Sequence, residues 1–225
     1  MYRYETHMHT KRISKCGRSE LNDCLDFYKK MGYDGVFITN HFIDGNINLL
    51  PDMTYEDKIR FYFSECELGK QYGKKIGLKV FEGVESSYHG TDFLIYGLSM
   101  EWFLSHPEIE NMNKRNQLEL FMSEGALVIQ AHPYREASYI DHIRLYPRSV
   151  EGVEVLNSNR TDTENKMANI YADEYSLLKI AGSDNHEGPG AKRLAGMESE
   201  SEIKSEKDFI EFLRKGKMSI FSIEL

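Results

Sequence analysis

Seven side chains of the types that bind transition metals fall into five short clusters, and each cluster follows an apolar stretch of the sequence. Neutral imidazole and carboxylate groups are the usual protein ligands of Zn, Mn and Fe. A metal centre at one rim of an α/β barrel needs ligands delivered in this way, a few from each strand end. We therefore expect a metal-dependent hydrolase. The candidate ligands are His7, His9, His41, Glu85, His132, Asp184 and His186.

The pair formed by His7 and His9 gives the clearest chemical signal. Successive side chains of a strand face opposite sides, so these two histidines share one face, while Thr6 and Met8 point away. An isolated His-x-His pair is more often a polar strand edge than a metal site. Here the pair ends an apolar alternating run and is matched by an Asp-x-His pair after a later run, and this repetition favours the metal interpretation.

The other candidates follow strand-like runs one at a time. Taken alone, His41 and His132 would each be interpreted as a hydrogen-bonded histidine at a strand end. Pro133 biases His132 toward extended backbone and ends its strand. Glu85 lies on the face of its run opposite Glu82. From that face its carboxylate could bridge two metals about 3.5–4 Å apart, which is the usual spacing in dinuclear hydrolytic sites.

The elements that must position these residues alternate apolar β runs with helical segments, a pattern typical of βα units and a largely parallel sheet. With 225 residues and 40% hydrophobic content, the chain can bury a substantial core, and we expect one α/β domain over residues 1–225. We expect about seven inner strands and a solvated acidic loop over 198–206. The predicted strands are 2–6, 35–39, 79–85, 93–97, 126–131, 150–156, 177–181 and 219–223. The predicted helices are 19–31, 54–72, 114–124, 161–175 and 205–215.

Composition narrows the possible partners and compartments. The net charge of −8 argues against a broad nucleic-acid interface, which needs a basic face. Three unevenly spaced cysteines imply no disulfide framework and favour the reducing cytoplasm. The first residues lack an apolar signal region, and no stretch is long enough to cross a bilayer. We expect a cytoplasmic protein without membrane or nucleic-acid partners.

The ordered motifs His-x-His, Thr-x-His, Gly-x-Glu, Ala-His-Pro and Gly-Ser-Asp-x-His resemble those of the PHP family, the polymerase and histidinol phosphatase domain. They span the chain from His7 to His186. The resemblance implies a distorted seven-stranded (β/α)7 barrel with two or three divalent ions (Zn, Mn or Fe) at the C-terminal ends of the strands, and phosphoester hydrolysis. It also implies the ligand sets, which are His7, His9, Glu85 and Asp184 for one ion, Glu85 and His132 for the second, and His41 and His186 for the third.

The chain departs from the family pattern at three positions. Trinuclear members have a further histidine after the His-x-His pair, whereas residues 11–17 contain none. Cys16 could substitute as a soft ligand, although a lone cysteine is more often a small buried apolar residue. Asp92 stands where many members have histidine, and an oxygen ligand there would favour Mn or Fe(II) over Zn. Asn40 replaces the usual aspartate before His41, which alters the hydrogen bond it can offer.

Two divalent ions can lower the pKa of a shared water and clamp the attacking and leaving oxygens of an in-line phosphoryl transfer. The resulting hydroxide would attack phosphorus, and Asp184 or His186 could pass a proton to the leaving alkoxide. Arg135 and Arg160 are the first candidates for binding the substrate phosphate, although a single arginine is more often a surface residue. No Gly-x-Ser-x-Gly nucleophile elbow is present.

We therefore predict a metal-dependent phosphatase or phosphodiesterase that acts on a small phosphorylated molecule. Three alternatives remain open, namely an inactive metal-binding or ligand-binding PHP module, an amidohydrolase-type enzyme and a proofreading-type nuclease. Amidohydrolase barrels also begin with His-x-His, but they use a bridging lysine where this chain has Glu85. The acidic composition makes the nuclease the weaker of these alternatives.

Overall fold

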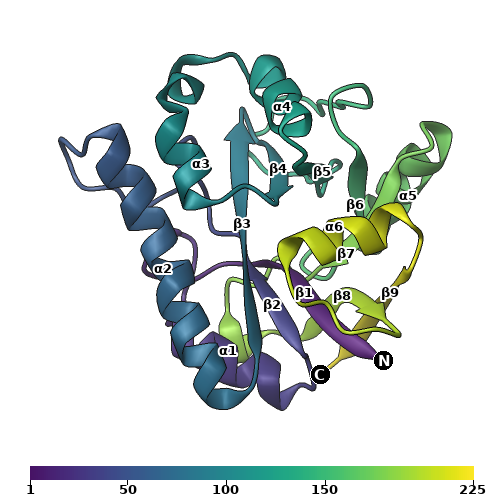
Figure 1. The fold of residues 1–225 in the computed structure, drawn as a ribbon. Helices are drawn as coiled ribbons and strands as arrows, with labels where there is room; N and C mark the ends of the chain where they lie inside the picture. The colour runs from purple at the N-terminus through teal and green to yellow at the C-terminus, as the bar shows by residue number, and fades with distance from the viewer.

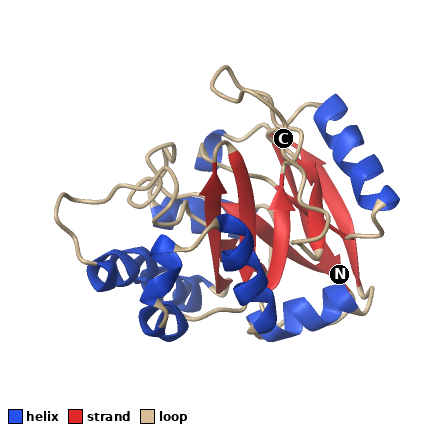
Figure 2. Ribbon diagram, turned by 90° about the horizontal axis from the view of Figure 1, so that it is seen from above, coloured by secondary structure: helices blue, strands red, loops and turns tan.

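The computed structural model describes residues 1–225 as a curved nine-stranded sheet with six α-helices outside it (Figure 1; Figure 2). The strands are β1 (Tyr2–Met8), β2 (Gly35–Ile38), β3 (Lys79–Tyr88), β4 (Thr91–Tyr96), β5 (Leu127–Ala131), β6 (Gly152–Asn157), β7 (Leu178–Gly182), β8 (Arg193–Ser199) and β9 (Met218–Glu224). The helices are α1 (Leu21–Lys30), α2 (Tyr55–Ile76), α3 (Met100–Ser105), α4 (Lys114–Ser123), α5 (Asp162–Glu174) and α6 (Glu206–Arg214), with short 3-10 turns at Pro107–Asn111 and Gly188–Gly190. The strand order is β7-β6-β5-β4-β3-β2-β1-β8-β9.

The α/β class is confirmed, but the predicted count of seven strands is wrong and the sheet is mixed. Strands β1, β2 and β3 are parallel, as are β5, β6 and β7, whereas β4 runs antiparallel to both of its neighbours. The reason lies in the two-residue turn of His89 (φ 49°) and Gly90 (φ 80°) between β3 and β4. Two successive positive φ values make a tight hairpin, which can join only antiparallel strands.

Strand β8 is absent from the sequence prediction. It pairs antiparallel with both β1 and β9, so its formation depends on two partners from opposite ends of the chain. Glu198 and Ser199 belong to this strand, which corrects the predicted acidic loop at its amino-terminal end. Helix α3 was also missed, because its six residues give too short a pattern, although Ser99 caps it by accepting a hydrogen bond from the Trp102 N–H.

The sheet is nearly closed into a barrel at one edge. Asn185, just beyond β7, forms a parallel bridge with Met8 at the end of β1. The His9 N–H donates to the Asn185 carbonyl oxygen at 3.1 Å, and the Asn185 N–H donates to the His7 carbonyl oxygen at 3.3 Å. The residues that follow β1 and β7 are therefore neighbours, although the two strands are far apart in strand order.

Aromatic side chains fill the interior of the barrel away from that edge. Phe37 of β2 lies 4.8 Å from Phe81 of β3 and 4.6 Å from Phe209 of α6, measured between ring centroids. These residues belong to one buried apolar cluster, to which β1 contributes Tyr4 and β4 contributes Tyr96. Helix α6 supplies three apolar residues to this cluster and so covers the interior core. The polar side chains of the interior instead lie at the edge where β1 and β7 meet.

Helix α2 begins where its sequence predicts but continues to Ile76, beyond the predicted end at residue 72. Thr54 and Asp57 form a capping box at the start of α2, which ends at Gly77 in the left-handed conformation with φ 70°. Thr161 and Glu164 form a capping box at the start of α5. None of the helices combines the length and apolar composition needed to cross a membrane.

Candidate metal centre

The structure brings all seven candidate ligands to the edge where β1 and β7 meet. His9, His41, His132 and Asp184 each follow the end of a strand, and Glu85 lies within β3. Each of these five residues is at most 7% exposed. Buried polar side chains at this density need partners, because each would otherwise lose its hydration without compensation.

An irregularity in β1 sets the direction of the histidine pair. Between Glu5 and Met8, β1 advances three residues while β2 advances two, which is the geometry of a β-bulge. The prediction that Thr6 points away from this region is wrong, because its hydroxyl donates to the carbonyl oxygen of Ala181 in β7 at 2.7 Å. Met8 does pack into the outer core with the helices. The bulge thereby changes the simple alternation that the sequence suggested.

Five of the side chains converge on one point, and we call His7, His9, Glu85, His132 and Asp184 the central cluster. The Nε2 atoms of His7 and His9 are 3.1 Å apart. Glu85 Oε1 lies 3.2 Å from His7 Nε2 and 3.3 Å from His132 Nε2. Asp184 Oδ1 lies 3.3 Å from His9 Nε2.

Glu154 of β6 fixes the ring of His7. Its Oε1 lies 2.9 Å from His7 Nδ1, and its Oε2 accepts from the His132 N–H at 3.0 Å and from Asn157 Nδ2 at 2.9 Å. An ionised carboxylate only accepts hydrogen bonds, so the His7 proton in the neutral ring lies on Nδ1 and the Nε2 lone pair faces the cluster. Glu154 is not among the predicted site residues, although a lone acid within the apolar run GVEVL is a signal for a buried, partnered charge.

A second hydrogen-bond chain fixes the ring of His9. Asn40 Oδ1 accepts from the Thr10 N–H at 2.7 Å and from the Ser14 hydroxyl at 2.9 Å. Because the Ser14 proton is committed to Asn40, the Ser14 oxygen accepts from His9 Nδ1 at 3.1 Å. The His9 Nε2 therefore also presents a lone pair. Asn40 thus orients the ring of His9 through Ser14.

Two facing lone pairs beside two carboxylates need a positive charge between them, which either a proton or a metal ion can supply. Both oxygens of Glu85 and Nε2 of His132 are buried without a hydrogen-bond partner. Burial opposes charging of His7, but Glu154, Asp184 and Glu85 outweigh it and raise the pKa of His7 well above its usual value. Burial likewise opposes ionisation of Glu85, yet His41, His7 and His9 hold its pKa well below the usual range. The central cluster therefore holds protons where a metal cation would also be stabilised by the buried carboxylates.

A second group of possible ligands lies beside the central cluster. Cys16, His41, His186 and the shared His9 offer ligand atoms within 4.8 Å of one another. The rings of His9 and His186 are stacked, with centroids 4.2 Å apart. Burial disfavours the Cys16 thiolate, but hydrogen bonds from His186 and His41 outweigh burial and lower the pKa of Cys16 to about 6. The thiol therefore lies within reach of two imidazoles.

Two of the candidate ligands have left-handed backbone conformations. The φ angle is 24° at His132 and 50° at Asp184. The strand does end before His132 as predicted, but the prediction of extended backbone there is wrong. Such conformations cost on the order of 1–3 kcal/mol for a residue other than glycine and are found mainly at functional sites. The surrounding hydrogen bonds of Glu154 hold the His132 backbone in this state.

The Gly-Ser-Asp motif begins with Gly182 because no side chain fits at this position. A Cβ at this position would lie 2.6 Å from the Cβ of His7 and 2.8 Å from Oε1 of Glu154. Next to it, the Ser183 N–H donates to Glu5 Oε1 at 2.8 Å, and the same oxygen accepts the His7 N–H at 2.8 Å. Glu5, which the sequence analysis also missed, ties the ends of β1 and β7 together.

The two arginines and Asp92 have separate surroundings. Arg135 contacts Asp92 Oδ2 at 2.9 Å, whereas His132 Nε2 is 3.9 Å from that oxygen. Asp92 belongs to none of the groups of closely spaced ligand atoms. Arg160 lines a cavity of about 930 Å³ together with Asp184 and His186. The Nε atoms of both Arg160 and Arg135 are buried and have no hydrogen-bond partner, but of these two arginines only Arg160 lines the cavity that contains Asp184 and His186.

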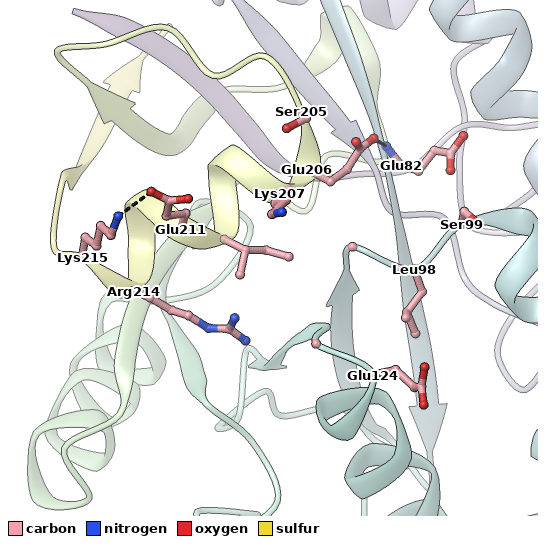
Figure 3. Close-up of a pocket in the computed structure, with 13 residues that line it drawn as sticks. Glu82, Leu98, Ser99, Glu124, Ser205, Glu206, Lys207, Glu211, Arg214 and Lys215 are labelled. Atoms are coloured by element: carbon pink, nitrogen blue, oxygen red, sulfur yellow. Dashed lines mark hydrogen bonds and ion pairs between the residues drawn. The ribbon is translucent and has the colours of Figure 1, made fainter.

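A second cavity, of about 640 Å³, lies away from the metal-seeking side chains. Figure 3 shows Leu98, Ser99 and Glu124 on one side of it and the α6 residues Glu206, Glu211 and Arg214 on the other. Acidic and basic side chains are mixed along its walls, and no candidate ligand reaches it. We therefore place the chemistry in the cavity that contains Asp184 and His186.

No family model and no curated protein matches the sequence. Solved structures do match the fold. A two-domain protein from Bacteroides vulgatus ATCC 8482, which contains a predicted PHP-like metal-dependent phosphoesterase, aligns with a TM-score of 0.72 and 16% identity over 98% of this chain and 64% of that chain. This chain thus spans less than two thirds of that protein.

Two further structures align at lower scores. A candidate metal-dependent phosphoesterase from Bifidobacterium adolescentis ATCC 15703 has a TM-score of 0.58 and 14% identity, over 94% of this chain and 96% of that chain. An amidohydrolase from Chromobacterium violaceum, with bound sulfate and no metal, has a TM-score of 0.54 and 13% identity, over 83% of this chain and 88% of that chain. These comparisons show that the chain shares the fold of these structures.

Proposed function

We propose that the protein is a metal-dependent phosphoesterase that hydrolyses a phosphomonoester or phosphodiester of a small molecule. The observation that supports this most strongly is the pair of Nε2 lone pairs of His7 and His9, which face each other at 3.1 Å between two buried carboxylates. This arrangement suits two or three divalent ions, and nitrogen and oxygen donors are compatible with Zn, Mn or Fe. The PHP-like fold of the chain supports the same conclusion.

The central cluster divides naturally into two ligand sets. His7, His9 and Asp184 form one group of closely spaced ligand atoms, and His7, Glu85 and His132 form another. Because one imidazole lone pair serves one ion, we assign His7 and His9 with Asp184 to the first ion and Glu85 with His132 to the second, with Glu85 as the bridge. Bound divalent ions would polarise the phosphoryl group and lower the pKa of a water.

The remaining residues bind the substrate and handle its proton. Arg160 would donate from its free Nε to a phosphate oxygen in the cavity beside Asp184. Burial opposes charging of His186, but Asp184 and Cys16 raise the pKa of His186 to about 9. His186 therefore holds a proton at neutral pH in the metal-free protein, and we propose that it donates a proton to the leaving oxygen, while Asp184 orients it.

The amidohydrolase neighbour makes a C–N hydrolase the second candidate. The central cluster contains no lysine, and we propose Glu85 for the bridging role that a lysine has in amidohydrolase barrels. An inactive module is less well supported, because the five side chains of the central cluster are all buried and close enough together to bind metal. The net charge of −8 does not support a nuclease.

We further propose that the protein works in the reducing cytoplasm. Cys16, Cys24 and Cys66 are all free thiols in the structure. Oxidation of Cys16 would place a bulkier group against His41 and His186, beside the proposed metal centre.

Release of the alcohol product from a panel of phosphomonoesters and phosphodiesters tests the proposed activity. We expect hydrolysis after the metal-free protein is loaded with Mn²⁺, Zn²⁺ or Fe²⁺, and none before loading. A matched panel of amides separates the second candidate, since amide turnover without hydrolysis of any phosphoester would replace the proposal.

A further inference from the structure

The loop between β1 and α1 places the only half-buried thiol of the chain against two histidines. Cys16 groups with His41 and His186, and the ligand atoms all lie within 4.8 Å of one another. Cys24 and Cys66 are buried in the apolar core instead. Imidazole Nδ1 of His41 is buried and has no aligned hydrogen bond, although Glu85 Oε2 lies 2.8 Å away.

The backbone holds Cys16 in this place. The Ser14 N–H donates to the Thr10 carbonyl oxygen and the Gly17 N–H to the Ser14 carbonyl oxygen, each at 3.0 Å. A Cβ on Gly17 would lie 2.6 Å from the carbonyl carbon and oxygen of Thr10, so only glycine allows this close turn. The Lys15 N–H donates to the Asn46 carbonyl oxygen at 2.9 Å, which ties the loop to the segment after β2. The thiol is therefore positioned by the fold and not by a mobile loop.

His186 has one nitrogen left for a ligand. Its Nδ1 donates to the carbonyl oxygen of Asp184 at 2.8 Å, so in the neutral ring the lone pair lies on Nε2. His9, the fourth member of the group, points its Nε2 at Asp184 and His7. The three side chains that remain, Cys16, His41 and His186, belong to separate segments and bring one sulfur and two nitrogens together.

We propose that Cys16, His41 and His186 form a thiolate-containing third metal position that takes Zn²⁺ and other thiophilic divalent ions in preference to Mn²⁺. The inference rests on the proposed metal centre. Thiolate is a soft ligand that Mn²⁺ binds poorly, whereas the nitrogen and oxygen donors of the central cluster suit both metals. The two kinds of position would therefore differ in metal identity. An ion bound at the third position would use the Nε2 lone pair of His186. His186 can therefore donate a proton to the leaving oxygen only while the third position is empty.

Cobalt substitution of the complete chain tests the proposal. We expect stepwise addition of Co²⁺ to metal-free wild type to produce a sulfur-to-cobalt charge-transfer band that belongs to one equivalent of the bound metal. Cys16→Ser should lose this band, and Cys16→His should bind the same number of ions as wild type without the band. The matched control Cys66→Ala should keep the band, since this thiol lies in the core. A wild type that binds cobalt without the band, or a band that persists in Cys16→Ser, overturns the assignment.

Alkylation of the wild type gives a second readout that needs no variant. Iodoacetamide should modify Cys16 in the metal-free protein and in the Mn²⁺-loaded protein, and Zn²⁺ should protect it, as measured by mass spectrometry of the Cys16 peptide. Equal modification with and without Zn²⁺ would contradict the proposal. Phosphoester hydrolysis is measured separately with Mn²⁺ alone. Protection without hydrolysis would support the thiolate position and reject the proposed activity, and hydrolysis without protection would do the reverse.

Discussion

Glu154 Oε1 lies 2.9 Å from His7 Nδ1, although 147 positions separate the two residues in the sequence. The contact joins β6 to the end of β1 and directs the His7 Nε2 lone pair at the central cluster. The same carboxylate holds the backbone N–H of His132. One buried acid thus positions a ligand from each of two strands.

Glu154→Gln should weaken metal binding by about 10–100-fold, the usual effect of removing a partner that orients a ligand histidine. The amide can donate to His7 Nδ1 and so favours the wrong tautomer, with the proton on Nε2. Competition with a chromophoric chelator measures the affinity. Glu151→Gln is the control, because Glu151 pairs with Arg214 at the surface. Equal affinities of the two variants would show that Glu154 has no role in orienting His7.

Glu85→Gln should lower kcat/KM for phosphoester hydrolysis by at least about 100-fold, because it removes the proposed bridging charge. The matched control is Glu82→Gln on the opposite face of β3, where the side chain pairs with Lys70 at 2.6 Å. A partly exposed pair of this kind contributes about 0–1 kcal/mol, so activity should be retained. Initial rates at saturating Mn²⁺ measure both variants, and full activity in Glu85→Gln is incompatible with a bridging role.

Gly182→Ala should destabilise the protein by about 1–3 kcal/mol through overpacking against His7 and Glu154. Denaturant unfolding measures the loss. Gly190→Ala is the control, because its Cβ would meet only Glu187 Cβ at 3.4 Å, and surface changes of this kind stay within about 0.5 kcal/mol. Comparable stabilities of the two variants would mean that the contact between β1 and β7 tolerates an added methyl group.

The stabilisation by bound metal should grow as pH rises. Burial opposes protonation of His7 and His186, but acidic neighbours raise both pKa values, that of His186 to about 9. A raised histidine pKa stabilises the metal-free fold below the unfolded value near 6.5 and ceases to do so as pH rises through the folded value. Between about pH 6.5 and 9, the metal-free protein should therefore lose this contribution while metal affinity increases. Thermal melting with and without Mn²⁺ across this range gives the increase in melting temperature caused by the metal. An increase that becomes smaller as pH rises contradicts the expectation.

Arg160→Ala should reduce kcat/KM by about 10–100-fold, mainly through KM, since a hydrogen bond to a charged group contributes roughly 1.5–3 kcal/mol. The reason is its free Nε beside Asp184 in the larger cavity. Arg148→Ala is the control, because Arg148 is exposed and away from this cavity. Steady-state kinetics decide the point, and an unchanged KM in Arg160→Ala removes this arginine from substrate binding.

The candidate ligands could be selected from the sequence because each lies at or near the end of a strand-like run, and the structure brings them together. The sequence predicted their partners poorly. Glu5 and Glu154 act through residues far along the chain, and no local pattern reveals such contacts. The bulge in β1 and the positive φ of His132 depend on hydrogen bonds from β7 and β6. Strand β8 depends on two partners as well, so its short, partly polar sequence gave no clear periodic signal.

Metal titration of the metal-free wild type, followed by elemental analysis of the washed protein, tests the central claim most directly. If the facing lone pairs of His7 and His9 belong to a metal centre, the protein should retain at least two Mn²⁺ or Zn²⁺ ions per chain, and Glu85→Ala should retain fewer. Less than one ion per chain in the wild type under metal-replete conditions near pH 8 would contradict the account.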